Sequence, residues 1–132
     1  GIVRNRTHVA MDGMGVFAFT MSKVPKCIKN LLENFCIDVD EVDYLLLHQA
    51  NQYIDEKIRK KMRFSKDKTP YCLEKFGNTS SGTIPMTMVT KISEQLRGGK
   101  NKLVMSGFGA GLSWAAVYVE TEFIEVLPLI EI

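Results

Sequence analysis

Several features that mark other classes of protein are missing from this sequence of 132 residues. No apolar run approaches the roughly 20 residues that a membrane-spanning helix requires, and the first residues lack the apolar core of a secretory signal. Cysteine occurs three times without a CxxC pair, which argues against a disulfide framework and fits a reducing cytosol. Histidine occurs only twice, so we expect no zinc site. We therefore expect a cytoplasmic protein without a metal or other cofactor, and without a membrane or nucleic acid as partner.

The composition is that of one globular domain spanning residues 1–132. Hydrophobic residues make up 45% of the chain and charged residues 24%, which is enough for a sizeable core. The net charge is only +2, but one segment carries seven cations and a single anion, Asp67. Such a concentration is a candidate docking surface for an acidic partner, and a solvated charged face is the open alternative. We call it the basic segment, and its cations are Lys57, Arg59, Lys60, Lys61, Arg63, Lys66 and Lys68.

Apolar spacing predicts three helices. In the first, Asp12 caps a helix whose apolar residues recur at steps of three and four as far as Phe35, and Pro25 predicts a kink or break within it. The second is an amphipathic helix capped by Asn51, and the third tolerates Pro85 in its first turn and ends at Gly98-Gly99. The apolar stripe of the third helix comprises Ile84, Met88, Ile92 and Leu96.

Strands are expected between these helices, so the fold class is α/β. The segment 42–47 is apolar throughout, as in a strand that is buried on both faces. The connection between the last two strands is too short for a crossover, so these strands should pair antiparallel. We expect a mixed, mostly parallel five-stranded sheet with helices packed on it, from segments 3–9, 42–47, 71–73, 103–106 and 113–120.

Three polar turns adjoin these elements, and in open α/β sheets sites gather at the carboxyl ends of the strands. They are His48-Gln49-Ala50-Asn51, Gly77-Asn78-Thr79-Ser80 and Gly107-Phe108-Gly109-Ala110-Gly111. His48 is either a functional group or a half-buried histidine bonded to backbone, and Asn78 is either functional or the cap of its own turn. The glycine-rich turn has GxGxG spacing and precedes a strand, which argues against a dinucleotide site and for close approach of a ligand to the backbone.

Together, in this order and at these separations, the three turns resemble the signature blocks of β-ketoacyl-ACP synthase III. Met11-Asp12-Gly13 before a phenylalanine-bearing helix is similar as well, so the resemblance runs from about residue 9 to residue 119. It implies a thiolase-like half-domain. It also implies a decarboxylative Claisen condensation in fatty-acid biosynthesis, in which a cysteine takes an acyl group from acyl-CoA and malonyl-ACP supplies two carbons.

The resemblance assigns His48 and Asn78 as the catalytic histidine and asparagine. Loss of carbon dioxide from a malonyl thioester leaves an enolate, and two neutral N–H donors would stabilise its oxygen, each by roughly 3–4 kcal/mol. Around them, the resemblance places Ala110 as an oxyanion-hole donor, Phe108 and Gly109 in the substrate pocket, and Asn51 near the pantetheine arm. Ala110 should be tolerated there only at negative φ.

The basic segment resembles the surface on which acyl carrier protein docks, with Lys57, Lys60 and Lys61 as the contributing cations. The family's arginine on this helix aligns with Tyr53, which is a departure. The nucleophilic cysteine belongs to the N-terminal half, so the resemblance implies that this chain is the C-terminal half and is inactive alone. Cys27, Cys36 and Cys72 are interpreted as structural thiols.

Two alternatives stay open at this level. One is a related thiolase-fold acyltransferase or synthase of a saccharide or polyketide pathway that keeps the same histidine and asparagine. The other is a non-catalytic module that binds acyl carrier protein or dimerises. For the parent enzyme we expect a homodimer that contains the N-terminal half. Segment 121–132 runs beyond the usual end of the family, and the sequence gives it no role.

Overall fold

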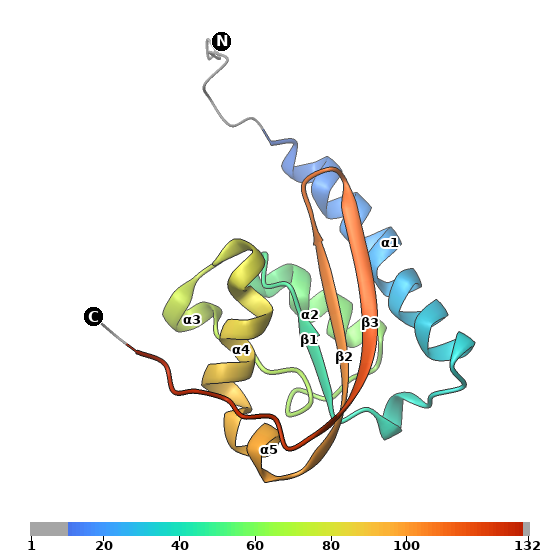
Figure 1. Cartoon of the computed structure of the whole chain (residues 1–132). Helices are drawn as coiled ribbons and strands as arrows, with labels where there is room; N and C mark the ends of the chain where they lie inside the picture. The colour runs from blue at the N-terminus through green and yellow to red at the C-terminus, as the bar shows by residue number, and fades with distance from the viewer. Residues whose placement is uncertain (1–10, 131–132) are drawn as a thin grey trace.

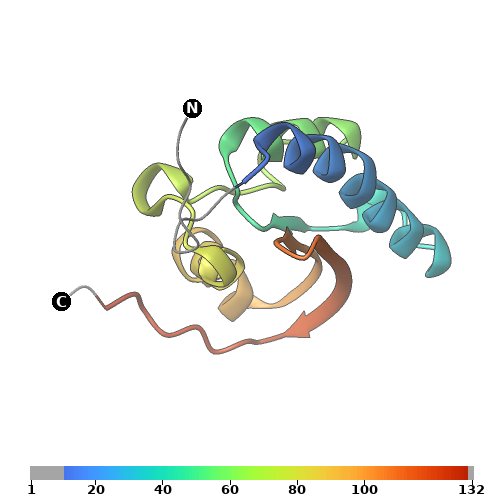
Figure 2. The ribbon, with the colours of Figure 1, turned by 90° about the horizontal axis from the view of Figure 1, so that it is seen from above.

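A computed structural model describes residues 11–130, in which a three-stranded sheet lies between two layers of helices (Figures 1 and 2). The strand order is β1-β2-β3, with β1 spanning Tyr44–Leu47, β2 Lys100–Gly109 and β3 Ser113–Glu122. β1 pairs with β2 in parallel and β2 with β3 antiparallel, so the prediction for the last two strands is confirmed.

The described residues contain three strands, where five were predicted for the whole chain. The segment 3–9 lies outside the described residues. The segment 71–73 does not join the sheet: two residues without regular structure lead directly into the short helix α3, Leu73–Phe76. Pro70 has no N–H to give to a ladder, and the N–H of Cys72 donates instead to the side chain of Gln49. The predicted strand at 71–73 was therefore wrong.

Helix α1, Gly13–Asn34, begins at Asp12, whose carboxylate accepts from the backbone N–H of Gly15. The helix continues through Pro25, so of the predicted kink or break the break was wrong. Proline removes the hydrogen bond to the carbonyl four residues earlier, which here belongs to Met21. The ammonium of Lys61 donates to that carbonyl at 2.9 Å. A side chain from another helix thus satisfies the group that the proline leaves free.

One face of the sheet is covered by α1 and by α2, Gln52–Lys61, as Figure 2 shows. The alternation of side chains along a strand sends Leu45 and Leu47 of β1 to this face, where both are buried in the larger core cluster. Val24 and Ile28 of α1 meet them there with no exposed surface. This cluster fixes the distance between α1 and the end of β1.

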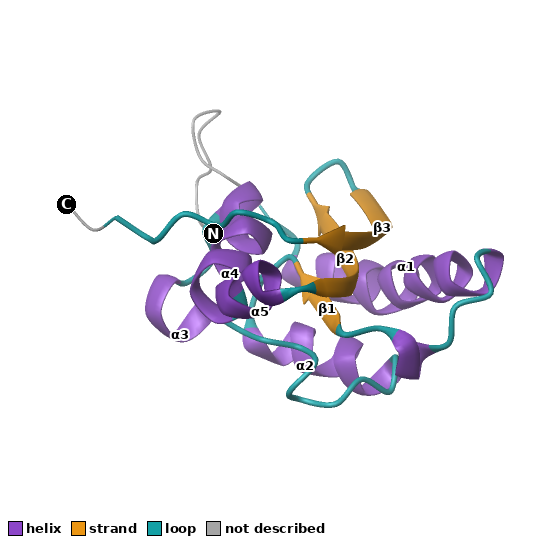
Figure 3. Ribbon diagram, turned by 60° about the horizontal axis from the view of Figure 1, so that its bottom comes forward, coloured by secondary structure: helices purple, strands orange, loops and turns teal. Residues whose placement is uncertain are grey.

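The opposite face is covered by α4, Thr83–Lys91, and α5, Ser93–Gly98 (Figure 3). One helix was predicted over this stretch. The chain instead leaves helical geometry at Ile92, with φ −132° and ψ 17°, and the Ile92 side chain is buried against Leu46 and Leu96. The predicted stripe is confirmed, because Ile92 and Leu96 are buried in this cluster and Ile84 and Met88 are partly buried against it. In α4, however, the fully buried residues are Thr83 and Thr87.

Past β3 the chain continues as an extended tail that crosses α5 (Figure 1). The N–H of Ile124 donates to the carbonyl of Leu96 at 3.0 Å, and Arg97 donates to the carbonyl of Val126 at 3.0 Å. Val126 is buried in the core cluster beneath. Two 3-10 turns, Val39–Glu41 and Ser80–Gly82, complete the elements. None of the helices in residues 11–130 has the length and hydropathy of a membrane span.

Candidate functional site

The three polar turns singled out in the sequence meet around one open cleft of about 1100 Å³. The cleft lies at the carboxyl end of β1, beside the first turn of α4 and the tip of the β2–β3 hairpin. Asp12, Gly15, Val16 and Thr20, at the beginning of α1, close another side. The predicted site residues that line it are His48, Asn78, Phe108, Gly109 and Ala110.

His48 directly follows β1 and is half-buried. Its Nδ1 lies 2.9 Å from the hydroxyl of Thr83, and its ring meets the edge of Phe108 at a centroid distance of 5.2 Å. Burial lowers the pKa of His48 from its ordinary value of 6.5, and a hydrogen bond with the backbone of Ser80 opposes this shift only in part. The imidazole is therefore neutral at neutral pH, and because Thr83 engages Nδ1, Nε2 is the nitrogen left for a ligand.

Asn78 caps its own turn, as the simpler interpretation of the sequence held. Its carboxamide oxygen accepts from the backbone N–H of Ser80 at 2.9 Å. Gly77 before it has φ +64°, a conformation that glycine adopts without strain. Because the cap engages the oxygen, the amide Nδ2–H₂ is the part of the side chain that remains free to donate. The structural role and a donor role are therefore compatible.

The glycine-rich segment is more regular than predicted. β2 continues as far as Gly109, so the turn is reduced to residues 110–112. Gly111 has φ +142°, and a Cβ there would collide with Ser113 at the beginning of β3. Ala110 is not among the described residues with positive φ, which meets the condition that the sequence set for it.

Gln49 has a structural role that the sequence did not predict, because it was named there only as part of the motif His48-Gln49-Ala50-Asn51. It has no exposed surface, its amide donates to Thr87 at 2.7 Å, and its carbonyl oxygen accepts from the N–H of Cys72 at 2.9 Å. Thr83 was missed as well, although it contacts His48. The available signal was the four-residue spacing of Thr83 and Thr87, which places both hydroxyls on one face of α4.

Asn51 and the lysines lie outside the lining of this cleft, although Ala50 belongs to it. The Asn51 carboxamide oxygen caps α2 by accepting from the N–H of Ile54 at 2.9 Å, so the predicted cap is confirmed. Lys57 is exposed and its ammonium lies 5.3 Å from the centroid of the Tyr53 ring, while Lys60 is exposed on the same helix.

Three cations of the basic segment donate hydrogen bonds to other groups of the fold. Arg59 is buried, forms an ion pair with Glu56 at 2.8 Å and donates to the carbonyl of Phe64. Lys68 donates to two backbone carbonyls near the beginning of β1, and Lys61 to the carbonyl in α1 described above. The charge available to a partner is therefore smaller than the sequence count indicated.

The cleft lining described here contains no cysteine. Cys72 is buried with its sulfur 3.3 Å from the hydroxyl of Thr87, Cys27 is partly buried and Cys36 is exposed. Within residues 11–130 no group of three or more His, Cys, Asp or Glu side chains is arranged to hold a metal ion. The cleft thus offers N–H donors and an aromatic wall rather than a cysteine nucleophile.

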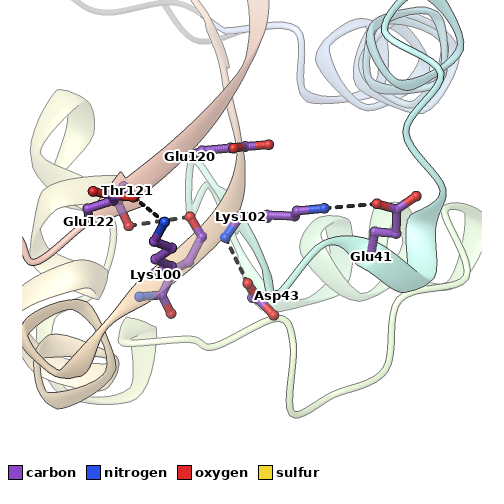
Figure 4. A pocket seen from close by; sticks show the side chains of 8 residues that line it. Glu41, Asp43, Lys100, Lys102, Glu120, Thr121 and Glu122 are labelled. Atoms are coloured by element: carbon purple, nitrogen blue, oxygen red, sulfur yellow. Dashed lines mark hydrogen bonds and ion pairs between the residues drawn. The ribbon is translucent and has the colours of Figure 1, made fainter.

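A second hollow of about 510 Å³ lies at the opposite end of the sheet (Figure 4). Its charged side chains pair with each other: Lys102 with Glu41 at 2.8 Å, and Lys100 with Glu122. The carboxylate of Asp43 accepts from the backbone N–H of Lys102 at 2.7 Å. Since both lysines of this hollow are already paired with carboxylates, it is a weaker candidate site than the cleft around His48.

Comparison with known proteins shows similarity to one family of enzymes. Residues 32–121 match the family model described as 3-oxoacyl-[acyl-carrier-protein (ACP)] synthase III C terminal. The chain is 40% identical over 114 residues to a β-ketoacyl-[acyl-carrier-protein] synthase III from Streptococcus gordonii, a match that covers 85% of this chain and 35% of that protein. This chain thus spans about a third of the length of the curated relatives it matches.

Solved structures show the same fold. A 3-oxoacyl-(acyl-carrier protein) synthase from Burkholderia xenovorans superposes with a TM-score of 0.85 at 32% identity, covering 89% of this chain and 34% of that one. The priming β-ketosynthase of the R1128 polyketide pathway superposes with a TM-score of 0.75 at 26% identity, covering 86% and 34%. The thiolase-like architecture is confirmed by these neighbours. The segment that matches the family model contains all three motif blocks, and the superposition with one synthase covers 89% of this chain. This chain therefore belongs to the 3-oxoacyl-ACP synthase III family and matches its C-terminal part.

Proposed function

We propose that this chain is the C-terminal catalytic half of a β-ketoacyl-ACP synthase III that condenses malonyl-ACP with an acyl-enzyme in fatty-acid biosynthesis. One observation carries the proposal: His48 and Asn78, thirty residues apart on two separate turns, line the same cleft. Each has one polar group engaged by the protein and one left for a ligand. The N-terminal half, outside this chain, would supply the nucleophilic cysteine, so residues 1–132 alone should be inactive.

In the proposed reaction the bond between C2 of the malonyl group and its carboxylate breaks, and carbon dioxide leaves. The electron pair of that bond forms an enolate, whose negative charge lies on the thioester oxygen. His48 Nε2–H and Asn78 Nδ2–H donate to that oxygen, and each such donor is worth about 10²–10³ in rate. The enolate carbon then attacks the acyl-cysteine carbonyl, and the cysteine thiolate is released. A neutral imidazole suits this role, which agrees with the lowered pKa of His48.

The remaining wall of the cleft suits the acyl-enzyme. We assign the backbone N–H of Ala110 as an oxyanion-hole donor to the acyl-cysteine carbonyl. Phe108 is 9% exposed and lies edge-on to His48, so it limits access of water to the malonyl group, and Gly109 admits the thioester close to the backbone. Asn51 would contact the pantetheine arm through its Nδ2–H₂, because its oxygen already caps α2.

Docking of acyl carrier protein is assigned to Lys57, Lys60 and Lys61 on α2. Lys57 and Lys60 are exposed, and Lys61 keeps two N–H donors beyond the one given to Met21. For the parent enzyme we propose a cytoplasmic homodimer with acyl-CoA and malonyl-ACP as substrates. The likeness to a priming β-ketosynthase supports one alternative, a related synthase of a polyketide pathway with the same decarboxylation chemistry.

The test uses the full-length parent enzyme. His48→Ala and Asn78→Ala should each abolish malonyl-ACP decarboxylation while leaving acylation of the cysteine by acyl-CoA intact, because both side chains serve the enolate. Equal loss of the two steps would contradict these roles. A screen of acyl acceptors on the same enzyme separates the fatty-acid assignment from the polyketide alternative.

A further inference from the structure

Thr83 lines the cleft beside His48 and is almost completely buried, with 1% of its surface exposed. Its hydroxyl oxygen is 2.9 Å from His48 Nδ1 and 3.1 Å from the carbonyl oxygen of Ser80. A hydroxyl has one hydrogen, so it donates to only one of these two acceptors. The choice matters, because it determines whether Nδ1 of His48 accepts a proton or carries one.

The Ser80 carbonyl is already satisfied without the hydroxyl. It accepts the backbone N–H of Thr83 at the end of the 3-10 turn Ser80–Gly82. If Nδ1 of the neutral imidazole carries no hydrogen, it needs a hydrogen-bond donor. Among the described residues, the side chain that contacts Nδ1 is Thr83. In the other arrangement Nδ1–H donates to the Thr83 oxygen and the hydroxyl donates to Ser80, which also pairs these groups but leaves Nε2 without a hydrogen. The proposed function requires an N–H donor at Nε2, so it selects the arrangement in which the Thr83 hydroxyl donates to Nδ1.

We propose that Thr83 is a positioning residue, which donates its hydroxyl proton to Nδ1 of His48 and thereby keeps the single imidazole hydrogen on Nε2, facing the cleft. The inference deepens the proposed function and rests on it, since only the Nε2–H form of the neutral ring can donate to an enolate oxygen. Without the hydroxyl, Nδ1 has only the Ser80 backbone carbonyl to face. An acceptor at this place favours the opposite tautomer, with the hydrogen on Nδ1 and a lone pair in the cleft.

The next turn of α4 provides a matched control. Thr87 is also fully buried, and its hydroxyl contacts Gln49, the neighbour of His48, at 2.7 Å. The two threonines thus join the same helix to the same strand end through adjacent residues. Thr87→Val removes a buried hydroxyl from the same face of α4 without changing any partner of the imidazole. Thr83→Val and Thr87→Val are therefore alike as packing changes and differ in their effect on His48.

The tautomer can be read directly by ¹⁵N NMR of the histidine side chains in the complete 132-residue chain, at about pH 8 where the ring is neutral. The chain has two histidines, so His8→Gln leaves the signals of His48 alone. Wild type, Thr83→Ser and Thr87→Val should carry the hydrogen on Nε2, and Thr83→Val should carry it on Nδ1. Hydrogen on Nδ1 in the wild type, or an unchanged tautomer in Thr83→Val, would overturn the inference. If Thr83→Val does not fold, Thr83→Ala takes its place, and the wild-type tautomer decides by itself.

Kinetics of the parent enzyme provide the second readout. Thr83→Val should lower kcat for malonyl decarboxylation about 100-fold, the loss expected for one donor, with KM and cysteine acylation unchanged. Thr83→Ser should restore it. A parent that does not decarboxylate malonyl-ACP at all refutes the proposed function, and the NMR result still decides the role of Thr83. Normal decarboxylation by Thr83→Val refutes the role of Thr83 and leaves the proposed function standing.

Discussion

Asp55, in the first turn of α2, is a buried carboxyl group that the proposed chemistry does not use. It has no exposed surface, and neither oxygen has a hydrogen-bond partner in the described part of the chain. Burial, together with the neighbouring charge of Glu56, raises the pKa of Asp55 from its ordinary value of 3.8 to about 8. The folded protein therefore keeps this proton at pH values where the unfolded chain has already released it.

The consequence is a stability that falls as pH rises. Between pH 4 and pH 8 the unfolded state binds fewer protons than the folded state, so each pH unit lowers the free energy of unfolding by about 1.4 kcal/mol. From pH 4 to pH 7 the loss is about 4 kcal/mol, a large part of the 5–15 kcal/mol typical of a domain. Asp55→Asn cannot ionise, although its amide adds one buried N–H. We expect a gain of about 2–3 kcal/mol at pH 7 and none near pH 4.

The measurement is urea denaturation of the wild-type chain and of Asp55→Asn at a series of pH values from 4 to 8.5. The control is Asp67→Asn, which removes the same charge from an exposed position in the loop after α2. The difference between wild type and Asp55→Asn should grow steadily with pH, and Asp67→Asn should track the wild type. Parallel curves for wild type and Asp55→Asn would refute the assignment of a buried neutral carboxyl group.

Three further predictions concern the fold. Lys61→Met should lower the free energy of unfolding by about 1 kcal/mol, because it removes the donor to the Met21 carbonyl. In a Pro25→Ala background, where α1 recovers its own hydrogen bond, the same change should cost less in a urea double-mutant cycle, and equal costs would disprove the link. Gly111→Ala should destabilise the hairpin by about 1–3 kcal/mol, given φ +142°, whereas Gly98→Ala, with nothing within 4 Å of an added Cβ, should be nearly neutral in the same thermal melts. The isolated chain should self-associate in sedimentation velocity, and a clean monomer would argue against this, because large apolar side chains are exposed at Met14, Phe35, Trp114, Leu127 and Ile130.

Much of the local structure followed from the sequence, because its causes lie within a few residues. Asp12 and Asn51 were identified as helix caps from side-chain chemistry next to an apolar repeat, and both accept the expected backbone N–H. The uninterrupted apolar segment before His48 predicted a buried strand, and Leu45–Leu47 are buried. The short connection after β2 predicted the antiparallel pair. These features need no knowledge of what lies across the fold.

The errors and omissions share the opposite cause. The sequence of α1 does not show that Lys61, forty residues away, would satisfy the carbonyl left free by Pro25. Periodicity predicted one helix ending at Gly98-Gly99, since an apolar stripe does not reveal that the chain leaves helical geometry at the buried Ile92. The extended segment before α3 gave no sign that Gln49 would take the N–H of Cys72.

For the site, the sequence by itself determined which residues have the right chemistry, through three motif blocks in a fixed order. Only the tertiary structure decided that His48 and Asn78 line one cleft, that the Thr83 hydroxyl contacts the imidazole, and that the buried Asp55 carboxyl group has no hydrogen-bond partner among the described residues. The physical reason is that chemistry belongs to a side chain, whereas pKa, tautomer and access to a ligand belong to its surroundings. Those surroundings come from segments tens of residues apart, which only the packing of α1, α2 and α4 on the sheet brings together.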